Sequence, residues 1–234
     1  MRETALELGL DVDQETDLIG IAQYHINERL GNRSIINQLL IEHFVKDVDV
    51  TPNHKILAEL PIATYWTTNY DDLIERSLKD AGKTPDVKRI SENICITVPK
   101  RDAVIYKMHG DISLPNDAIL TKEDYETYEL NRGAYSIVLQ ADLVSKTFIF
   151  IGFSFEDPNL IYILGRIKNL LGTRNTRNHY CFFKKEAASS RPDILRKQEL
   201  RLKDLNRYGI SAILIDDYPE ITKTLNAVSS LYKR

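Results

Sequence analysis

The sequence predicts an α/β protein with a mostly parallel sheet that is flanked by helices. Short apolar runs alternate with amphipathic segments along the chain, and this alternation is typical of parallel strands joined by right-handed helical crossovers. Three of the runs end in small polar clusters, which are Asn69–Asp71, His109–Asp111 and Gly152–Asp157. Parallel sheets bind ligands at the carboxyl ends of their strands, so these clusters predict a site.

The helical pattern begins at the N-terminus and lasts to residue 62. Apolar residues recur there at spacings of three and four. Thr51 and Pro52 predict the cap and first turn of a helix that Pro61 ends. We expect residues 1–62 to pack on the core as a helical segment and residues 63–234 to form the sheet, within a single domain.

The first predicted strand, at residues 64–68, leads into a helix that ends near Gly82. Two further apolar runs, Ile94–Val98 and Val104–Met108, predict strands. A helix then begins at Thr121, which has the spacing to Asp124 of a capping box. The later elements alternate regularly: a helix over 134–143, a strand over 147–151, a helix over 158–171, a strand over 179–183, a helix over 192–208, a strand over 210–215 and a helix over 221–232.

The composition excludes several classes of protein. The 31 basic and 34 acidic residues give a net charge of −3, which argues against direct nucleic-acid binding. Two cysteines cannot build a disulfide framework or a four-cysteine zinc module, and they suit a reducing cytoplasm. We find no apolar run that could cross a bilayer and no signal peptide, so we expect a cytoplasmic protein without membrane contact.

His109 and Gly110 follow an apolar strand. A histidine can act as a general base near neutral pH, and a glycine lets a ligand approach the backbone closely. The structural alternative for His109 is a hydrogen bond to a loop carbonyl.

Asn69 and Asp71 lie where a strand gives way to a helix. Either can serve simply as a helix cap. Asn69 also offers a neutral donor and acceptor for a ribose hydroxyl or a water.

The segment from Gly152 to Pro158 joins a buried strand to a helix. A helix N-terminus attracts phosphate, but Asp157 would repel one, so we expect ribose contacts from this loop, including Ser154. The structural alternative is a tight connection in which Gly152 only allows packing. The remaining histidines show no ligand spacing, and we expect no metal site.

Five segments together resemble the sirtuin-like domain of prokaryotic NAD hydrolases of antiphage defence. In order they are PNHKILA from Pro52, TTNYDDLIE from Thr67, KMHGDI from Lys107, ILTKEDYETY from Ile119 and FIFIGFSFEDPNL from Phe148. The resemblance covers about residues 35–215 and implies a Rossmann-like fold that binds NAD as a substrate, without a metal. It also implies cleavage of the nicotinamide–ribose bond.

The resemblance implies a role for each candidate residue. Asn69 and His109 would be catalytic, Asp71 would support the site, and Gly152 and Ser154 would line the ribose and nicotinamide side. Gly110 would also contact NAD. In this family a first strand with a Gly-Ala-Gly loop binds the phosphates, and none of the ten glycines forms such a cluster here. Either that unit is missing from this polypeptide or the fold does not need it.

The resemblance further implies a homo-oligomer and a separate partner, such as a HerA-type ATPase or a sensor protein. Two alternatives to NAD hydrolysis stay open. One is a non-catalytic nucleotide-binding or assembly module of a defence complex. The other is a NAD-dependent protein deacylase, which the absence of a zinc module disfavours.

Overall fold

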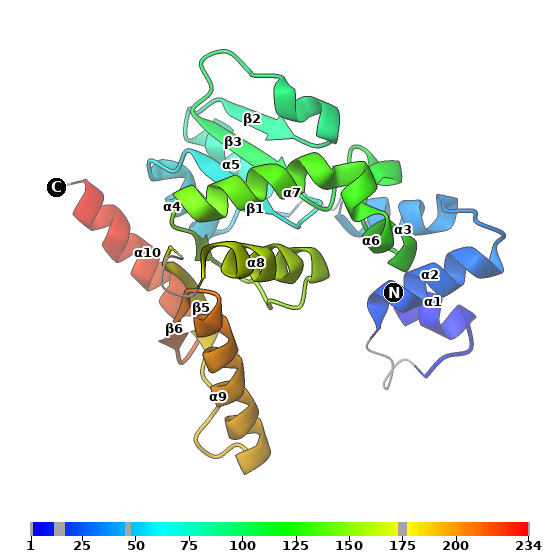
Figure 1. Cartoon of the computed structure of the whole chain (residues 1–234). Helices are drawn as coiled ribbons and strands as arrows, with labels where there is room; N and C mark the ends of the chain where they lie inside the picture. Colours follow the sequence, from blue (N-terminus) through cyan, green and yellow to red (C-terminus); the bar gives the residue numbers. More distant parts are fainter. Residues whose placement is uncertain (1, 12–16, 45–47, 173–176, 234) are drawn as a thin grey trace. The chain divides into compact units, whose positions relative to one another are not determined.

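Helices and strands alternate along this chain, as its sequence predicts (Figure 1). The computed structural model describes four stretches, which are residues 2–11, 17–44, 48–172 and 177–233. The chain forms two compact units, Met1–Tyr135 and Ser136–Arg234, and each contains a three-stranded parallel sheet. The predicted α/β class is therefore confirmed. The predicted boundary at residue 62 lies inside the first unit and stays a prediction.

The sheet of the first unit has the strand order β1-β3-β2. The central strand β3 (Ala103–Lys107) lies between β1 (Thr64–Thr67) and β2 (Pro85–Lys88), and both neighbours run parallel to it. Successive side chains of a strand point to opposite faces, so β3 supplies the core on both sides of this sheet.

One face of this sheet is covered by α4 (Pro52–Glu59) and α5 (Leu73–Asp80). Ala58 of α4 and Leu78 of α5 pack with Ile105 of β3 in a small buried core. Helix α4 begins at Pro52 as predicted, because the hydroxyl of Thr51 accepts a hydrogen bond from the His54 N–H.

The opposite face is aromatic. Trp66 of β1 and Tyr106 of β3 stack with ring centroids 4.1 Å apart. Tyr135 of α7 (Tyr128–Ser145) meets both rings edge-on at 6.4 and 6.3 Å.

Arg132 interrupts the helical geometry of α7, and its guanidinium donates to the backbone carbonyls of three other segments. The helix is therefore longer than predicted but contains a kink.

The prediction of a strand at Ile94–Val98 is wrong. The chain forms a 3₁₀ helix that begins at Ser91 and ends at Cys95 (η1), and the strand that pairs with β3 on the side away from β1 is β2 instead. In β2 the buried side chains are Asp86 and Lys88, which form an ion pair with an N–O distance of 2.7 Å. The strand thus buries its charged residues, which hides it from a search for apolar alternation.

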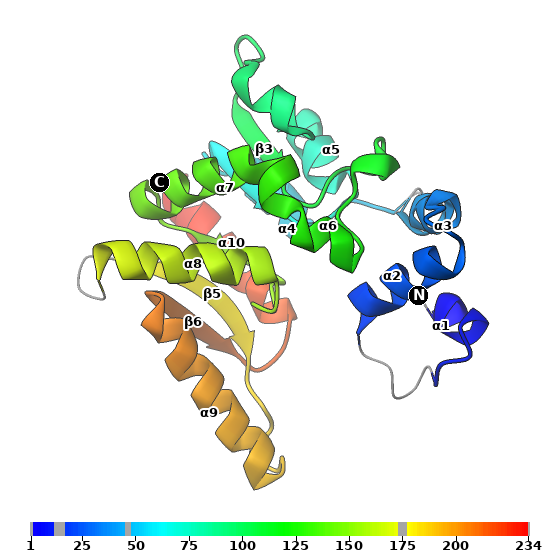
Figure 2. The same cartoon turned by 45° about the vertical axis from the view of Figure 1, so that its right-hand side comes forward.

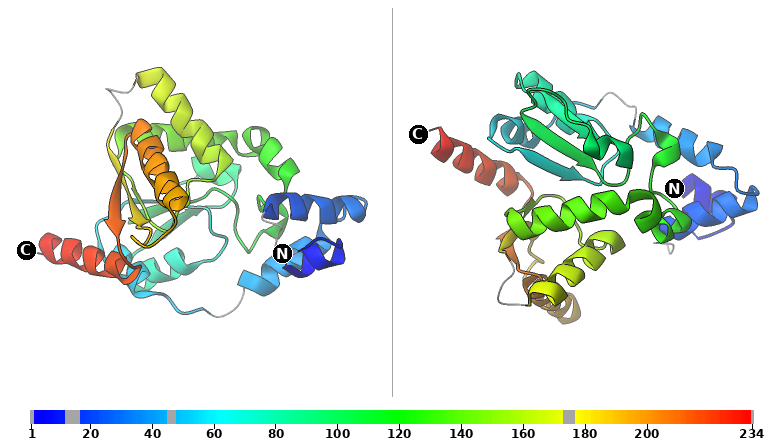
Figure 3. Two further views of the ribbon diagram at one scale, coloured as in Figure 1. Left: turned by 90° about the horizontal axis from the view of Figure 1, so that it is seen from below. Right: turned by 45° about the horizontal axis from the view of Figure 1, so that its top comes forward.

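Before α4, the described part of the chain forms α1 (Arg2–Glu7), α2 (Leu18–Glu28) and α3 (Ser34–Phe44). They confirm the predicted helical segment. Figure 3 shows them beside the green helix α6 (Lys122–Glu126), which α2 contacts. Helix α3 contacts η2 (Pro115–Asp117).

Arg33, just before α3, fastens these helices to the segment around α6. Its guanidinium donates to Asp124 at 2.7 Å and to the carbonyl of Ala118. Asp124 also closes the predicted capping box with Thr121. These bonds make the N-terminal helices part of the same packed unit.

The sheet of the second unit has the order β4-β5-β6, with β4 (Ile149–Phe150), β5 (His179–Lys184) and β6 (Ile210–Ile215). Figure 2 shows α8 and α9 on one face of this sheet and α10 on the other. The three helices span Pro158–Leu171, Pro192–Arg207 and Pro219–Tyr232.

The cap of α8 is the predicted one, because the Asp157 carboxylate accepts from the Leu160 N–H at 2.8 Å. Within the part of the chain that the structure describes, no helix is long and apolar enough to cross a membrane.

Candidate active site

The loops that contain Asn69 and His109 leave neighbouring strands at the same level. Thr67 of β1 pairs in register with Lys107 of β3, and both strands end there. Asn69 and His109 each follow by two residues. Neighbouring strands lie about 4.8 Å apart, so the two loops start side by side at the carboxyl edge of the sheet.

Backbone hydrogen bonds continue this pairing beyond the sheet. The Met108 N–H donates to the Thr67 carbonyl at 2.9 Å, and the Ile112 N–H donates to the Tyr70 carbonyl at 2.9 Å. The two predicted clusters therefore form one continuous surface of loop backbone.

Asn69 is exposed, and its backbone N–H donates to the Thr67 hydroxyl at 3.0 Å. This bond fixes the turn that presents the side-chain amide at the open edge. An uncharged amide in such a position suits a ribose hydroxyl or a water better than it suits a phosphate.

Asp71 has the local role that the sequence left open. Its carboxylate accepts a hydrogen bond from the Leu73 N–H at 3.1 Å, at the start of α5. Its backbone carbonyl accepts from the Lys107 ammonium group. Support of a NAD site by Asp71 therefore stays a prediction.

His109 lies in aromatic surroundings and has only 6% of its surface exposed. Its ring meets Tyr125 and Tyr128 edge-on, with centroid distances of 5.5 and 6.5 Å. Its carbonyl accepts from the Ile119 N–H at 2.8 Å. These contacts hold the backbone and the imidazole in one orientation, which a general base requires.

Gly110 has a φ of +96°, and a Cβ there would lie 2.9 Å from the Ala118 Cα. The close approach predicted at this glycine is therefore one that the chain makes to itself. A contact between Gly110 and NAD remains a prediction.

A buried charge cluster beneath the two loops was missed at the level of sequence. Lys107 is fully buried, and its ammonium nitrogen lies 3.4 Å from a carboxylate oxygen of Glu75 and 3.4 Å from one of Asp111. Arg89 also approaches Asp111, at 3.1 Å. The one sequence feature that could have indicated this cluster is Lys107 itself, a lysine at the end of an otherwise apolar strand just before His109.

The two carboxyl groups of this cluster respond differently to their surroundings. Burial raises the pKa of Glu75, although the charge of Lys107 acts in the opposite direction. Burial would also raise the pKa of Asp111, but hydrogen bonds from Ser113 and the charges of Lys107 and Arg89 outweigh it and lower that pKa. Asp111 is therefore the ionised partner that Lys107 needs.

Gly152 and Ser154 lie in the second unit, in the loop after β4. Gly152 has a φ of +67°, and a Cβ there would meet no heavy atom within 4 Å. This space beside the backbone leaves room for a ligand. Ser154 is exposed, and its carbonyl accepts from Arg201 of α9 at 3.0 Å.

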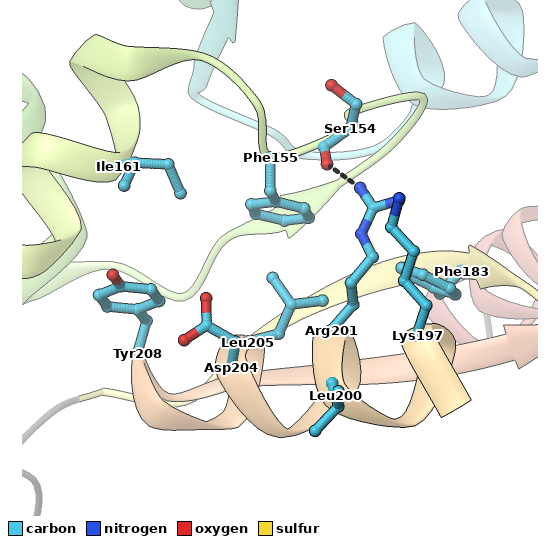
Figure 4. A pocket seen from close by; sticks show the side chains of 10 residues that line it. All are labelled: Ser154, Phe155, Ile161, Phe183, Lys197, Leu200, Arg201, Asp204, Leu205 and Tyr208. Atoms are coloured by element: carbon cyan, nitrogen blue, oxygen red, sulfur yellow. Dashed lines mark hydrogen bonds between the residues drawn. The ribbon is translucent and has the colours of Figure 1, made fainter. Parts of the chain in front are cut away.

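Ser154 and Phe155 of this loop line a pocket of about 290 Å³. Figure 4 shows the side chains that surround it. Phe155 and Phe183 supply aromatic lining, while Lys197 and Arg201 supply positive charge. The guanidinium of Arg201 also approaches a carboxylate oxygen of Glu156, at 3.3 Å. The pocket thus combines apolar groups, two cations and the carboxylate of Asp204 next to the predicted ribose-binding loop.

The six predicted site residues fall into two groups. Asn69, Asp71, His109 and Gly110 come together at the carboxyl edge of the first sheet, and Gly152 and Ser154 lie at the carboxyl end of β4 in the second unit. Among the residues that the structure describes, no three histidine, cysteine or acidic side chains cluster as metal ligands would.

A mostly parallel α/β fold with polar side chains at its strand ends defines the class, and comparison gives the family. Residues 63–213 match the model of the SIR2-like domain, so the chain belongs to that family and the predicted sirtuin-like membership is confirmed.

Three relatives illustrate this membership. The NAD(+) hydrolase ThsA of Bacillus cereus (strain MSX-D12) is 50% identical, over 98% of this chain and 49% of its own length. The protein of the same name from Acinetobacter baumannii (strain 532279) is 47% identical, over 100% of this chain and 49% of its own length. Defense-associated sirtuin 2 of Bacillus subtilis is 30% identical, over 56% of this chain and 13% of its own length. The chain spans about half the length of the ThsA proteins it matches.

Proposed function

We propose that this chain is the NAD-cleaving domain of an antiphage defence protein, and that it hydrolyses the bond between nicotinamide and ribose. The observation that carries this proposal is the in-register pairing of Thr67 with Lys107, which brings the loops of Asn69 and His109 to the same edge. The family match and the name of the ThsA relatives, NAD(+) hydrolase, support the same activity, and the name of the Bacillus subtilis relative supports a role in defence.

The chemistry suits these residue types. Cleavage of a glycosidic bond passes through an oxocarbenium-like state. Nicotinamide leaves NAD as a neutral molecule, so the reaction needs no strong general acid. Asn69 would hold a ribose hydroxyl or the attacking water, and a ring nitrogen of His109 would accept the proton that this water loses. The products are then nicotinamide, ADP-ribose and one proton.

The remaining candidates would bind the substrate. Gly152 has free space beside its backbone, which supports its predicted place along the ribose and nicotinamide. Ser154 would contact the same part of NAD, Gly110 would contribute backbone, and Asp71 would support the turn that carries Asn69.

The biological setting follows from the same family. We propose that the protein acts in the cytoplasm, where it depletes NAD during infection, and that it works as a homo-oligomer. A separate partner, such as a HerA-type ATPase or a sensor protein, would hold the activity in check. A toxic hydrolase needs such control, and assembly that favours the competent conformation is one way to supply it.

The test is nicotinamide release from NAD by the purified chain, alone and together with the protein encoded beside it. We expect release that falls by about 100-fold or more in an Asn69→Ala variant. The matched control is Asn226→Ala, which removes an exposed amide from α10 and leaves release unchanged. If the folded chain releases no nicotinamide under either condition, the non-catalytic assembly module becomes the better reading.

A further inference from the structure

Lys107 occupies an unusual position for a lysine. It is the last residue of the central strand β3, and none of its surface is exposed. Lysine is almost never fully buried unless its charge is paired, because removing an ammonium group from water is strongly unfavourable. Its burial therefore calls for specific partners.

The partners of Lys107 come from three segments. Its ammonium group donates to the Asp71 carbonyl in the Asn69 loop. The same nitrogen lies 3.4 Å from the Asp111 carboxylate in the His109 loop and 3.4 Å from the Glu75 carboxylate on α5. An ammonium group has three donors, so this single side chain can link both loops to each other and to the helix beneath them.

We propose that Lys107 is a positioning residue that sets Asn69 and His109 relative to each other. This inference rests on the proposed NAD cleavage for its catalytic consequence, but the link between the loops is a property of the fold. Lys107 touches no substrate in this scheme. It acts only through the backbone of Asp71 and the side chain of Asp111.

Each end of this link is itself held in place. The Asp111 carboxylate accepts from the backbone and hydroxyl of Ser113, at 2.9 and 2.6 Å, and pairs with Arg89. The Lys107 carbonyl accepts from Arg132 at 3.1 Å. Loss of the ammonium group would therefore loosen the Asn69 loop, which would keep its other bonds to this part of the structure, such as that between the Tyr70 carbonyl and the Ile112 N–H.

The test uses Glu75→Gln as its reference. Glutamine keeps the size of the Glu75 side chain and removes its charge, and the two loop partners of Lys107, the Asp71 carbonyl and the Asp111 carboxylate, stay in this variant. Lys107→Met is then made in the Glu75→Gln background, so that the methionine does not leave the buried Glu75 carboxylate without a cation, while Asp111 keeps Arg89. We expect kcat for nicotinamide release to fall about 100-fold from the reference, with KM within about threefold, because small misplacements of reacting groups reduce rate more than binding.

A conservative variant separates positioning from general packing. Lys107→Arg in the same background keeps the charge but not the shape of the ammonium group, and we expect a kcat about tenfold above that of the methionine variant. If the methionine variant does not fold, the arginine variant decides alone. A kcat at least about threefold below the reference supports the proposal, and an unchanged kcat overturns it.

Amide hydrogen exchange measures the contact between the two loops without any need for enzymatic activity. The Ile112 amide bonds to the Tyr70 carbonyl and so reports on the contact between the loops. We expect its exchange to become about tenfold faster in the methionine variant, while amides of α10 stay unchanged. Faster exchange in a chain that is inactive even as wild type would end the proposed function and keep the link. Unchanged exchange together with an unchanged kcat would end the inference about Lys107.

Discussion

His109 and His179 are almost equally buried, with 6% and 4% of their surfaces exposed, yet they lie at opposite ends of their strands. His109 follows the carboxyl end of β3 in the first unit, and His179 is the first residue of β5 in the second unit. In open parallel sheets ligands bind at the carboxyl ends. The two histidines therefore offer an internal comparison between a candidate functional position and a structural one.

The surroundings of His179 show what a structural histidine does. Its Nδ1 atom accepts a hydrogen bond from the Phe148 N–H at 3.1 Å, and its own backbone N–H donates to the Gly209 carbonyl at 2.9 Å. Burial, with a smaller contribution from the charge of Arg177, lowers the pKa of His179 to about 4. This imidazole is neutral and serves the backbone.

The surroundings of His109 differ from those of His179 in the groups that contact the imidazole ring. Its ring is held by the aromatic rings of Tyr125 and Tyr128, and the loop that carries it borders the exposed Asn69 loop. Burial alone does not separate the two histidines. The direction of the strand does, because it decides which end of the sheet a residue occupies.

The largest expected effect concerns activity. We predict that His109→Ala lowers nicotinamide release by about 1000-fold, the upper part of the range for general acid–base catalysis. His179→Phe should leave the release by folded protein unchanged. Initial rates with saturating NAD and melting curves of both variants measure this. A His109→Ala protein that melts far below the wild type would show that His109 has a structural role and would remove it from the site.

The next effect concerns the loop after His109. Gly110→Ala should lower the free energy of unfolding by about 3 kcal/mol, because a left-handed alanine is strained and its Cβ would clash with Ala118. Gly152→Ala should cost only about 1 kcal/mol, because its φ is also positive but the space beside it is open. Urea denaturation of both variants compares them. Equal losses would mean that the Ala118 segment can move away from Gly110.

The third effect is a pH dependence of the free energy of unfolding. Unfolded His179 takes up a proton near pH 6.5 and the folded residue only near pH 4, so its contribution to stability is complete above pH 6.5 and is lost as the pH falls toward 4. Between pH 7 and pH 5 this loss is about 2 kcal/mol.

The His179→Phe variant isolates this contribution, because it keeps an aromatic ring and has no proton to gain. The wild type should therefore lose about 2 kcal/mol more than the variant between the two pH values, as measured by urea denaturation. Parallel pH curves for the two proteins would show that His179 does not cause the dependence.

Most elements could be predicted because their local signals agree with their packing. Asp157 and Pro158 predict the start of α8, and the spacing from Thr121 to Asp124 predicts the start of α6. Both helix caps form as expected. β2 could not be predicted, because its buried residues Asp86 and Lys88 are charged and stabilise each other only in the folded state.

The candidate site also has a part that the sequence could predict and a part that it could not. Asn69 and His109 stand out in the sequence because each follows a strand, and their shared edge depends only on the order of parallel strands. The link through Lys107 could not be predicted, since its partners Glu75 and Asp111 lie on different segments. Contacts that depend on three segments at once leave no periodic trace in a sequence.

The hydrogen bonds of Arg33 affect where the N-terminal boundary of a stable fragment of this protein should be placed. The family match begins at residue 63, but Arg33 pairs with Asp124 and helps to hold its pKa below the ordinary value. A fragment trimmed to the family boundary would lose that cation, and with it the support of the Ala118–Asp124 segment, whose Ile119 N–H holds the carbonyl of His109. Evolutionary and physical boundaries differ here, and the physical one lies before residue 33.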